Sequence, residues 1–172
     1  MTARLTQIAL CLSLAGMATT AQAELFGLID ARLEWMRDVA AYKFANDLPV
    51  EDLAREQIVI AGTLETATKA GLDPKATQAF FESQISAAKD IQTCWIARWA
   101  SDQAPTTYRD LTQEVRPAIL DLGAQIIAAL QDQTPVHTSD RDDFNAVVQV
   151  DCLSEDSKKA LFDALTQVRT FQ

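Results

Sequence analysis

This 172-residue chain holds few of the residues that interrupt helices, with only five glycines and five prolines. Stretches that alternate apolar and polar residues, the pattern of half-buried strands, are nearly absent. Alanine and leucine are the most frequent residues instead, and glutamine is common. These features argue against a β-rich protein and predict an all-α fold, a single domain of about six helices.

Histidine and cysteine are scarce as well, and acidic residues outnumber basic ones. His137 is the only histidine, so no Cys/His spacing suits zinc. The run from Asp140 to Asp143 lacks the turn glycine and terminal glutamate of a calcium loop, and it is interpreted as an acidic helix start. The formal net charge is -9. Without a basic stripe the chain is not expected to bind nucleic acid or an anionic membrane surface.

The N-terminus has the pattern of a cleavable signal peptide. Arg4 supplies a positive start, residues 8–15 are apolar, and Ala21-Gln22-Ala23 is a small-x-small cleavage site. The sequence therefore predicts a signal peptide over residues 1–23, cut after Ala23, and one domain over residues 24–172. The expected product is an exported protein, periplasmic or secreted.

Neither a membrane span nor a lipid anchor is expected. The apolar N-terminal stretch is too short to cross a bilayer as a helix. Cys11 lacks the small preceding residue of a lipoprotein signal. Cys94 and Cys152 remain after cleavage, and export permits a disulfide between them. A buried free thiol at Cys94 is an equally ordinary outcome, so both alternatives stay open.

Apolar residues recur at helical spacing through most of the chain. Four long helices are predicted, followed by two shorter ones that begin near Ser139 or Asp140 and at Ser154. The long helices run from Leu25 to Asn46, from Pro49 to Gly71, from Pro74 to about Trp99, and from Leu111 to Gln131. Pro117 lies early in the fourth helix and predicts a late or kinked first turn.

A set of cationic and amide residues stands out against the acidic background: Arg32, Lys43, Arg55, Gln92 and Arg116. Arg32 and Lys43 are 11 residues apart. At ~100° per residue this spacing is about three turns plus 20°, which puts both side chains on one face of one helix. Cations that gather at one place in an acidic chain predict a site for a small anion with more than one carboxylate.

The order and spacing of these residues resemble the all-helical chorismate mutases. Arg32 is followed by Lys43, then by Arg55 and Glu56 in the string from Leu48 to Glu56, and then by Gln84-Ile85-x6-Gln92. The signal peptide and Arg116, in the context Asp110-Leu111-x4-Arg116-x-Ala118-Ile119, resemble the exported subclass.

The resemblance implies a Claisen-type rearrangement of chorismate to prephenate, with no cofactor and no covalent intermediate. It also implies roles for six residues in a site built within a single chain. Arg32 and Arg116 would hold the two substrate carboxylates. Lys43 and Gln92 would donate to the ether oxygen, and Arg55 and Glu56 would address a carboxylate and the ring hydroxyl region. Family members often form homodimers, and no interface can be identified from the sequence.

Three positions depart from the family pattern. Ala88 stands where members often carry Ser or Thr, and Val59 where some exported members carry Gln. Gln92 stands where some exported members carry Glu. A glutamate there must be protonated to donate, whereas an amide donates at any pH.

Each of these residues, taken alone, is more ordinary as a solvated helix residue than as a ligand. Their co-occurrence in order favours the site. Two alternatives remain at this stage. One is a non-catalytic helical binding protein for a small dicarboxylate, and the other is an interaction module in which the arginines are incidental.

Overall fold

The computed structural model describes residues 15–101, 103–132 and 135–171, the side chains of residues 15–20 excepted. It contains seven α-helices, a π-helical turn and a 3₁₀ turn, and no strand within these ranges. The elements are α1 (Ala15–Glu34), α2 (Met36–Ala45), α3 (Leu53–Lys69), α4 (Pro74–Ser101), η1 (Leu111–Val115), α5 (Arg116–Asp132), η2 (Thr138–Asp140), α6 (Arg141–Val147) and α7 (Glu155–Leu165). The prediction of an all-α protein is confirmed.

Much of the predicted signal peptide, including Arg4 and Cys11, lies outside the described residues. The described part of the chain has no helix that is long and apolar enough to cross a membrane. The predicted cleavage point after Ala23 falls within α1.

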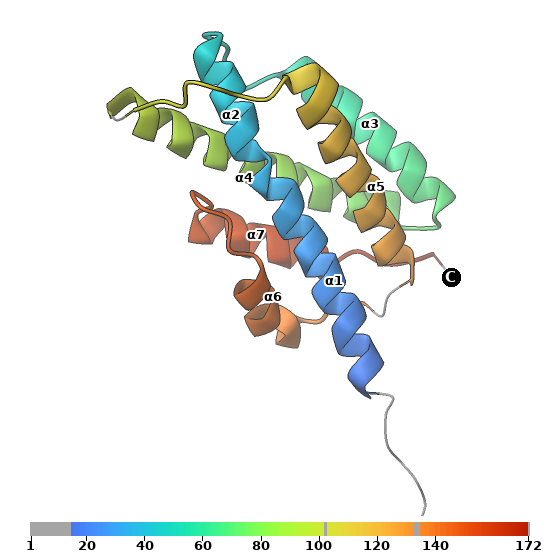
Figure 1. The fold of residues 1–172 in the computed structure, drawn as a ribbon. Coiled ribbons are helices and arrows are strands. Elements are labelled where there is room, and N and C mark those ends of the chain that lie inside the picture. Colours follow the sequence, from blue (N-terminus) through green and yellow to red (C-terminus); the bar gives the residue numbers. More distant parts are fainter. Residues whose placement is uncertain (1–14, 102, 133–134, 172) are drawn as a thin grey trace, which may run out of the picture.

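The first predicted helix is divided in two at Trp35. This residue keeps a right-handed helical backbone, with φ -60° and ψ -14°, and its carbonyl accepts from the Val39 N–H at 3.1 Å. Figure 1 shows that α2 continues along the line of α1. Arg32 of α1 and Lys43 of α2 therefore still lie along one nearly continuous helical axis.

The second predicted helix begins later than expected, so the placement of Pro49 in its first turn was wrong. α3 starts at Leu53, where the Asp52 carboxylate accepts from the Arg55 N–H at 3.1 Å. This N-cap is stronger than a start at proline, because it satisfies a backbone donor that the helix leaves free. The preceding segment stays a loop, and its Val50 carbonyl accepts from Lys43 Nζ at 2.6 Å.

Pro117 has the predicted effect on the fourth helix. The Asp110 carboxylate caps a wide first turn by accepting from the Thr112 and Gln113 N–H groups. The Arg116 N–H then reaches back five residues to the Leu111 carbonyl, which defines the π-helical turn. Regular α-helix follows from Arg116, with Pro117 as its second residue. Arg116 is thus fixed at a helix junction.

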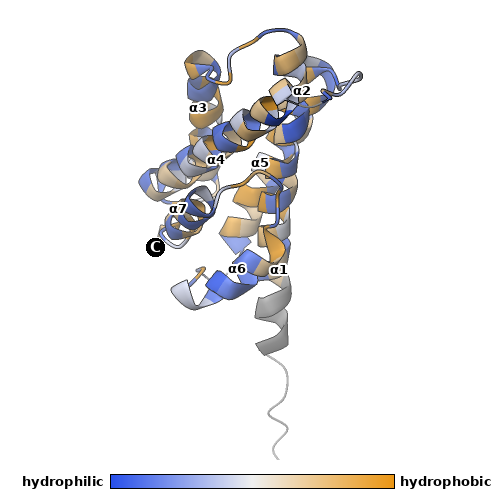
Figure 2. Ribbon diagram, turned by 90° about the vertical axis from the view of Figure 1, so that its left-hand side faces the viewer, coloured by the Kyte–Doolittle hydropathy of each residue, from blue (hydrophilic) through white to orange (hydrophobic). Residues whose placement is uncertain are grey.

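The core forms where α1 meets the two closing helices and the long α4. Phe144 of α6 lies edge-on to Phe26 of α1 at 5.2 Å, and Phe162 of α7 packs against Phe144 at 5.1 Å. Residues predicted to pack the last helix are buried, namely Leu161, Leu165 and Val168. Orange and blue alternate around the helices in Figure 2, as expected for helices that bury one face. This core buries Leu25, Phe26 and Ile29 of α1, whereas Arg32 in the last turn of α1 and the part of α4 from Phe81 to Gln92 line a cavity.

Cys94 and Cys152 form a disulfide, with their Cα atoms 5.7 Å apart. The bond joins the C-terminal half of α4 to the turn before α7, where Cys152 adopts a left-handed φ of 72°. The alternative of a free thiol at Cys94 is therefore not realised. The crosslink spans 58 residues and ties the closing helix to the helix that carries Gln92.

The crosslink predicts a stability loss in a Cys94→Ala/Cys152→Ala variant. A loop of this length restricts the unfolded chain, so the variant should lose about 2–4 kcal/mol of unfolding free energy. Urea denaturation measures the difference. Added reductant should destabilise the wild type and leave the variant unchanged. An unaltered wild-type midpoint in reductant would contradict a stabilising role.

Candidate active site

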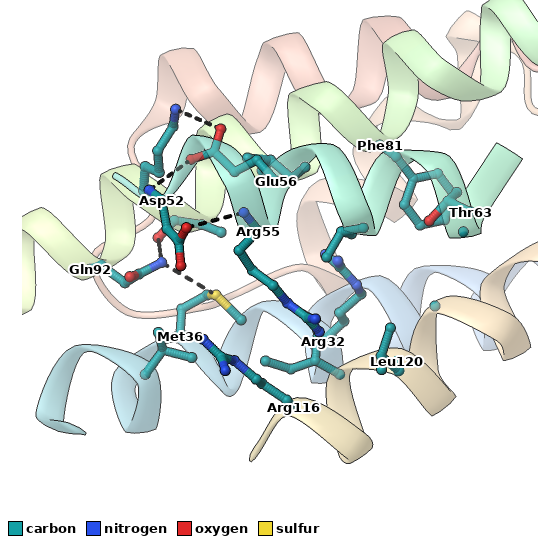
Figure 3. A pocket seen from close by; sticks show the side chains of 18 of the residues that line it. Arg32, Met36, Asp52, Arg55, Glu56, Thr63, Phe81, Gln92, Arg116 and Leu120 are labelled. Atoms are coloured by element: carbon teal, nitrogen blue, oxygen red, sulfur yellow. Dashed lines mark hydrogen bonds and ion pairs between the residues drawn. The ribbon is translucent and has the colours of Figure 1, made fainter. Parts of the chain in front are cut away.

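A cavity of about 200 Å³ opens between α1, α2, α3, α4 and α5. All six residues predicted for the site line it: Arg32, Lys43, Arg55, Glu56, Gln92 and Arg116. They come from five helices, so only the tertiary fold brings them together. Figure 3 shows the side chains of Arg32, Arg55 and Arg116 entering the same space from three of these helices.

Arg32 is the most deeply buried of the cations, with 4% of its surface exposed. Its Nη1 donates to Gln84 Oε1 at 3.0 Å, and its Cζ lies 5.8 Å from the centre of the Phe81 ring. Burial lowers the pKa of Arg32 to about 10. The guanidinium is therefore still charged at neutral pH.

Lys43 is also buried, with 9% exposed. Burial lowers the pKa of Lys43 below its ordinary value, against the opposing effect of the nearby Asp52 and Glu56 carboxylates, while Arg116 and Lys89 lower it further. One of its three ammonium protons is directed at the Val50 carbonyl. The other two remain for a ligand in the cavity.

The arginines of the cavity are not neutralised by acids. Within the described ranges, no carboxylate oxygen lies within 4.0 Å of the side-chain nitrogens of Arg32, Arg55 or Arg116. In a chain of net charge -9 this arrangement is unusual. Asp52 and Glu56 line the same cavity but pair with none of the three guanidinium groups, which therefore make an attractive site for a multiply charged anion.

Glu56 is held by a lysine that sequence analysis did not select. Lys89 Nζ lies 3.2 Å from Glu56 Oε2 and 3.5 Å from Glu51 Oε1, and Lys89 also lines the cavity. It precedes Gln92 by three residues on α4, a spacing that puts both on one helix face. That spacing was the available signal for Lys89.

Gln92 is buried and directed toward its own helix. Its Nε2 donates to the Ala88 carbonyl at 2.9 Å and lies 3.7 Å from Met36 Sδ, while its Oε1 has no partner among the described residues. The second N–H of the amide is engaged only by the Met36 thioether, a weak acceptor that a ligand oxygen can replace. Ala88 and Val59, the two apolar departures from the family pattern, both line the cavity.

The rest of the wall is mainly apolar and includes Val39, Phe81, Ile85, Ile119 and Ile127. An apolar enclosure with a few converging polar groups is typical of a small-molecule site. Across the part of the chain that the structure describes, no three His, Cys, Asp or Glu side chains are grouped to hold a metal ion.

Comparison with known proteins identifies the family. Residues 19–93 match the family model described as chorismate mutase type II. The monofunctional chorismate mutase of Enterobacter agglomerans is 32% identical over 145 residues, which cover 82% of this chain and 80% of that protein. The secreted chorismate mutase of Yersinia pestis is 31% identical and is covered to 78%.

Solved structures agree with these relatives. The crystal structure of secreted chorismate mutase from Yersinia pestis superposes with a TM-score of 0.80 at 29% identity, covering 86% of this chain and 98% of that one. Chorismate mutase from Burkholderia thailandensis gives 0.74 at 27% identity. The fold and the cavity define a helical isomerase of the chorismate mutase type II class. This chain belongs to that family, and it resembles the family's secreted members.

We expect the buried Arg32–Gln84 pair to lower the free energy of unfolding. The lowered pKa of Arg32 corresponds to about 3 kcal/mol of burial cost. That cost is present at every pH where the guanidinium is protonated in both states, and it is relieved only as the pH rises past about 10. Arg32→Met/Gln84→Leu should therefore raise the unfolding free energy at pH 7 by about 2–3 kcal/mol and abolish turnover.

Urea denaturation at pH 7 measures the change. Lys75→Met replaces an exposed cation of α4 and should stay within about 0.5 kcal/mol of the wild type. A double variant with a lower unfolding free energy than the wild type would show that the pair stabilises the fold, which would contradict this prediction.

Proposed function

We propose that this protein rearranges chorismate to prephenate in the central cavity. The observation that carries the proposal is the set of three guanidinium groups without carboxylate partners that line one enclosed space together with Lys43 and Gln92. Chorismate carries two carboxylates, which such groups bind. The family membership of the chain supports the same reaction.

Binding selects a compact conformer of the substrate. Arg32 and Arg116 hold the two carboxylates, and Arg55 supports one of them from the first turn of α3. Glu56, fixed by Lys89 at 3.2 Å, addresses the ring hydroxyl. Holding both ends of a flexible dianion brings the reacting carbons together, which lowers the entropic part of the barrier.

The chemical step needs donors and no covalent partner. The carbon–oxygen bond of the ether breaks as the new carbon–carbon bond forms, and no proton is transferred. Negative charge develops on the ether oxygen, where Lys43 and Gln92 donate. Both donors are buried at the cavity wall before the substrate binds, so they stabilise the transition state more than the ground state.

Lys43→Ala should remove most of the turnover. Loss of one donor to developing negative charge typically lowers kcat by about 10²–10³-fold. The disappearance of chorismate in the ultraviolet measures the rate. Lys69→Ala is the matched control, because Lys69 is exposed and pairs with Glu65 outside the cavity. A folded Lys43→Ala protein with near-normal prephenate formation would remove Lys43 from the mechanism.

The pH dependence distinguishes the two donors. Between mildly acidic and mildly alkaline pH, kcat/KM should change little, because the Gln92 amide does not titrate. On the alkaline side it should fall as Lys43 loses its proton, with an apparent pKa below the ordinary 10.5. Gln92→Glu should lose activity as the pH rises through the pKa of the new carboxyl. A steep wild-type loss near neutrality would count against Gln92 as a donor.

We also propose that the protein is exported and that cleavage follows Ala23. The secreted relatives support export. Expression in a bacterium with an intact secretion system should give periplasmic protein whose N-terminal residue is Glu24, as read by mass spectrometry. Full-length protein confined to the cytoplasm would contradict both parts.

All six site residues come from one chain. This supports a site that is complete in each subunit, so a homodimer would not be needed for catalysis.

A further inference from the structure

Gln84 is a buried polar residue that does not reach the cavity. It belongs to α4, is 0% exposed, and is absent from the cavity lining. Its Oε1 accepts from Arg32 Nη1 at 3.0 Å, across 52 residues of sequence. Arg32 itself lines the cavity. Gln84 therefore lies behind the guanidinium and not in front of it.

The amide has no other hydrogen-bonding task in the described structure. Gln84 Nε2 is buried without a partner, so the bond to Arg32 is what its polar group gains from being there. An aliphatic side chain of similar size would fit a buried position at lower cost. The presence of a half-satisfied amide points to a role in holding Arg32.

Gln84, the hydrogen-bond partner of Arg32, is neutral, so it does not cancel the positive charge of the guanidinium. A carboxylate at this distance would form a bidentate or single ion pair and would compete with an anionic ligand for the guanidinium. An amide oxygen fixes the direction of the guanidinium through one N–H and leaves its net charge uncompensated. The other N–H groups keep their capacity for an incoming carboxylate.

We propose that Gln84 is a positioning residue that fixes the Arg32 guanidinium at the cavity wall while leaving its positive charge free for a substrate carboxylate. The proposal rests on the proposed role of Arg32 in substrate binding. It assigns a function to a residue that does not itself contact the substrate.

Two substitutions separate orientation from charge. Gln84→Met keeps an unbranched side chain of similar length and removes the acceptor. Gln84→Glu keeps the shape and the acceptor but adds a negative charge. KM for chorismate should rise about tenfold in the Met variant, because one hydrogen bond to a charged group is lost. It should rise further in the Glu variant, because the added carboxylate also competes for the guanidinium. kcat should change less, because Arg32 binds ground and transition states alike.

A purely structural role for the amide predicts a different order. The isosteric Glu variant would then resemble the wild type, and its KM would lie below that of the Met variant. KM depends on the folded molecules only, so a partly unfolded preparation lowers the apparent kcat and leaves the comparison intact. A KM within twofold of the wild type in either variant overturns the proposal.

The control is Thr77→Val, which removes a buried hydroxyl from the same helix. Thr77 is 0% exposed, its Oγ1 has no partner among the described residues, and it does not line the cavity. Its KM should match the wild type. In an Arg32→Met background, both Gln84 substitutions should have no further effect on the dissociation constant for prephenate, measured by calorimetry, since the residue they act through is gone. A full effect in that background overturns the proposal.

Calorimetric binding of prephenate, the dicarboxylate product, provides a readout that does not depend on turnover. Its dissociation constant should follow the same order: wild type tightest, then Met, then Glu. Absence of chorismate turnover in the wild type would refute the proposed function alone, because the order of prephenate affinities still tests Gln84. Equal prephenate affinities in the three proteins would refute the positioning role.

Discussion

The burial of positive charge without a neutralising acid is the constraint on which the site depends. A guanidinium in an apolar cavity loses hydration, and ion pairing is the usual compensation. Here the net charge of -9 supplies many carboxylates, yet within the described residues none pairs with the three cavity arginines. The two acids that line the cavity have other partners: Asp52 caps α3 through the Arg55 N–H, and Glu56 pairs with Lys89.

The protein restrains each cation of the cavity before a ligand binds. Arg32 is held by a neutral amide, Lys43 by the Val50 carbonyl, and Arg116 by its place at the junction of a π-helical turn and α5. Each restraint orients the group without removing its charge. This is preorganisation in the electrostatic sense: the cost of assembling like charges is met during folding, by the packing of α1, α4 and the closing helices, and does not recur in each catalytic cycle.

Much of this architecture was predictable from sequence, because the signals are local or periodic. The apolar stripes indicated the helices, Pro117 indicated the altered start of α5, and family spacing indicated the six residues of the cavity. The break at Trp35 and the capping of α3 by Asp52 were not predicted, since both depend on which of several local hydrogen-bond arrangements the tertiary packing favours. Gln84 and Lys89 were missed as functional candidates because their importance comes from partners more than 30 residues away. The choice between a disulfide and a free thiol likewise required the distance between α4 and the turn before α7.

The central claim is that uncompensated cations recognise both carboxylates of one substrate. The most direct test compares kcat/KM for chorismate with that for its two monomethyl esters, each of which lacks one negative charge. The account predicts that either ester is at least about tenfold poorer, as expected for the loss of a charge-assisted contact. An ester that reacts as well as chorismate would contradict it.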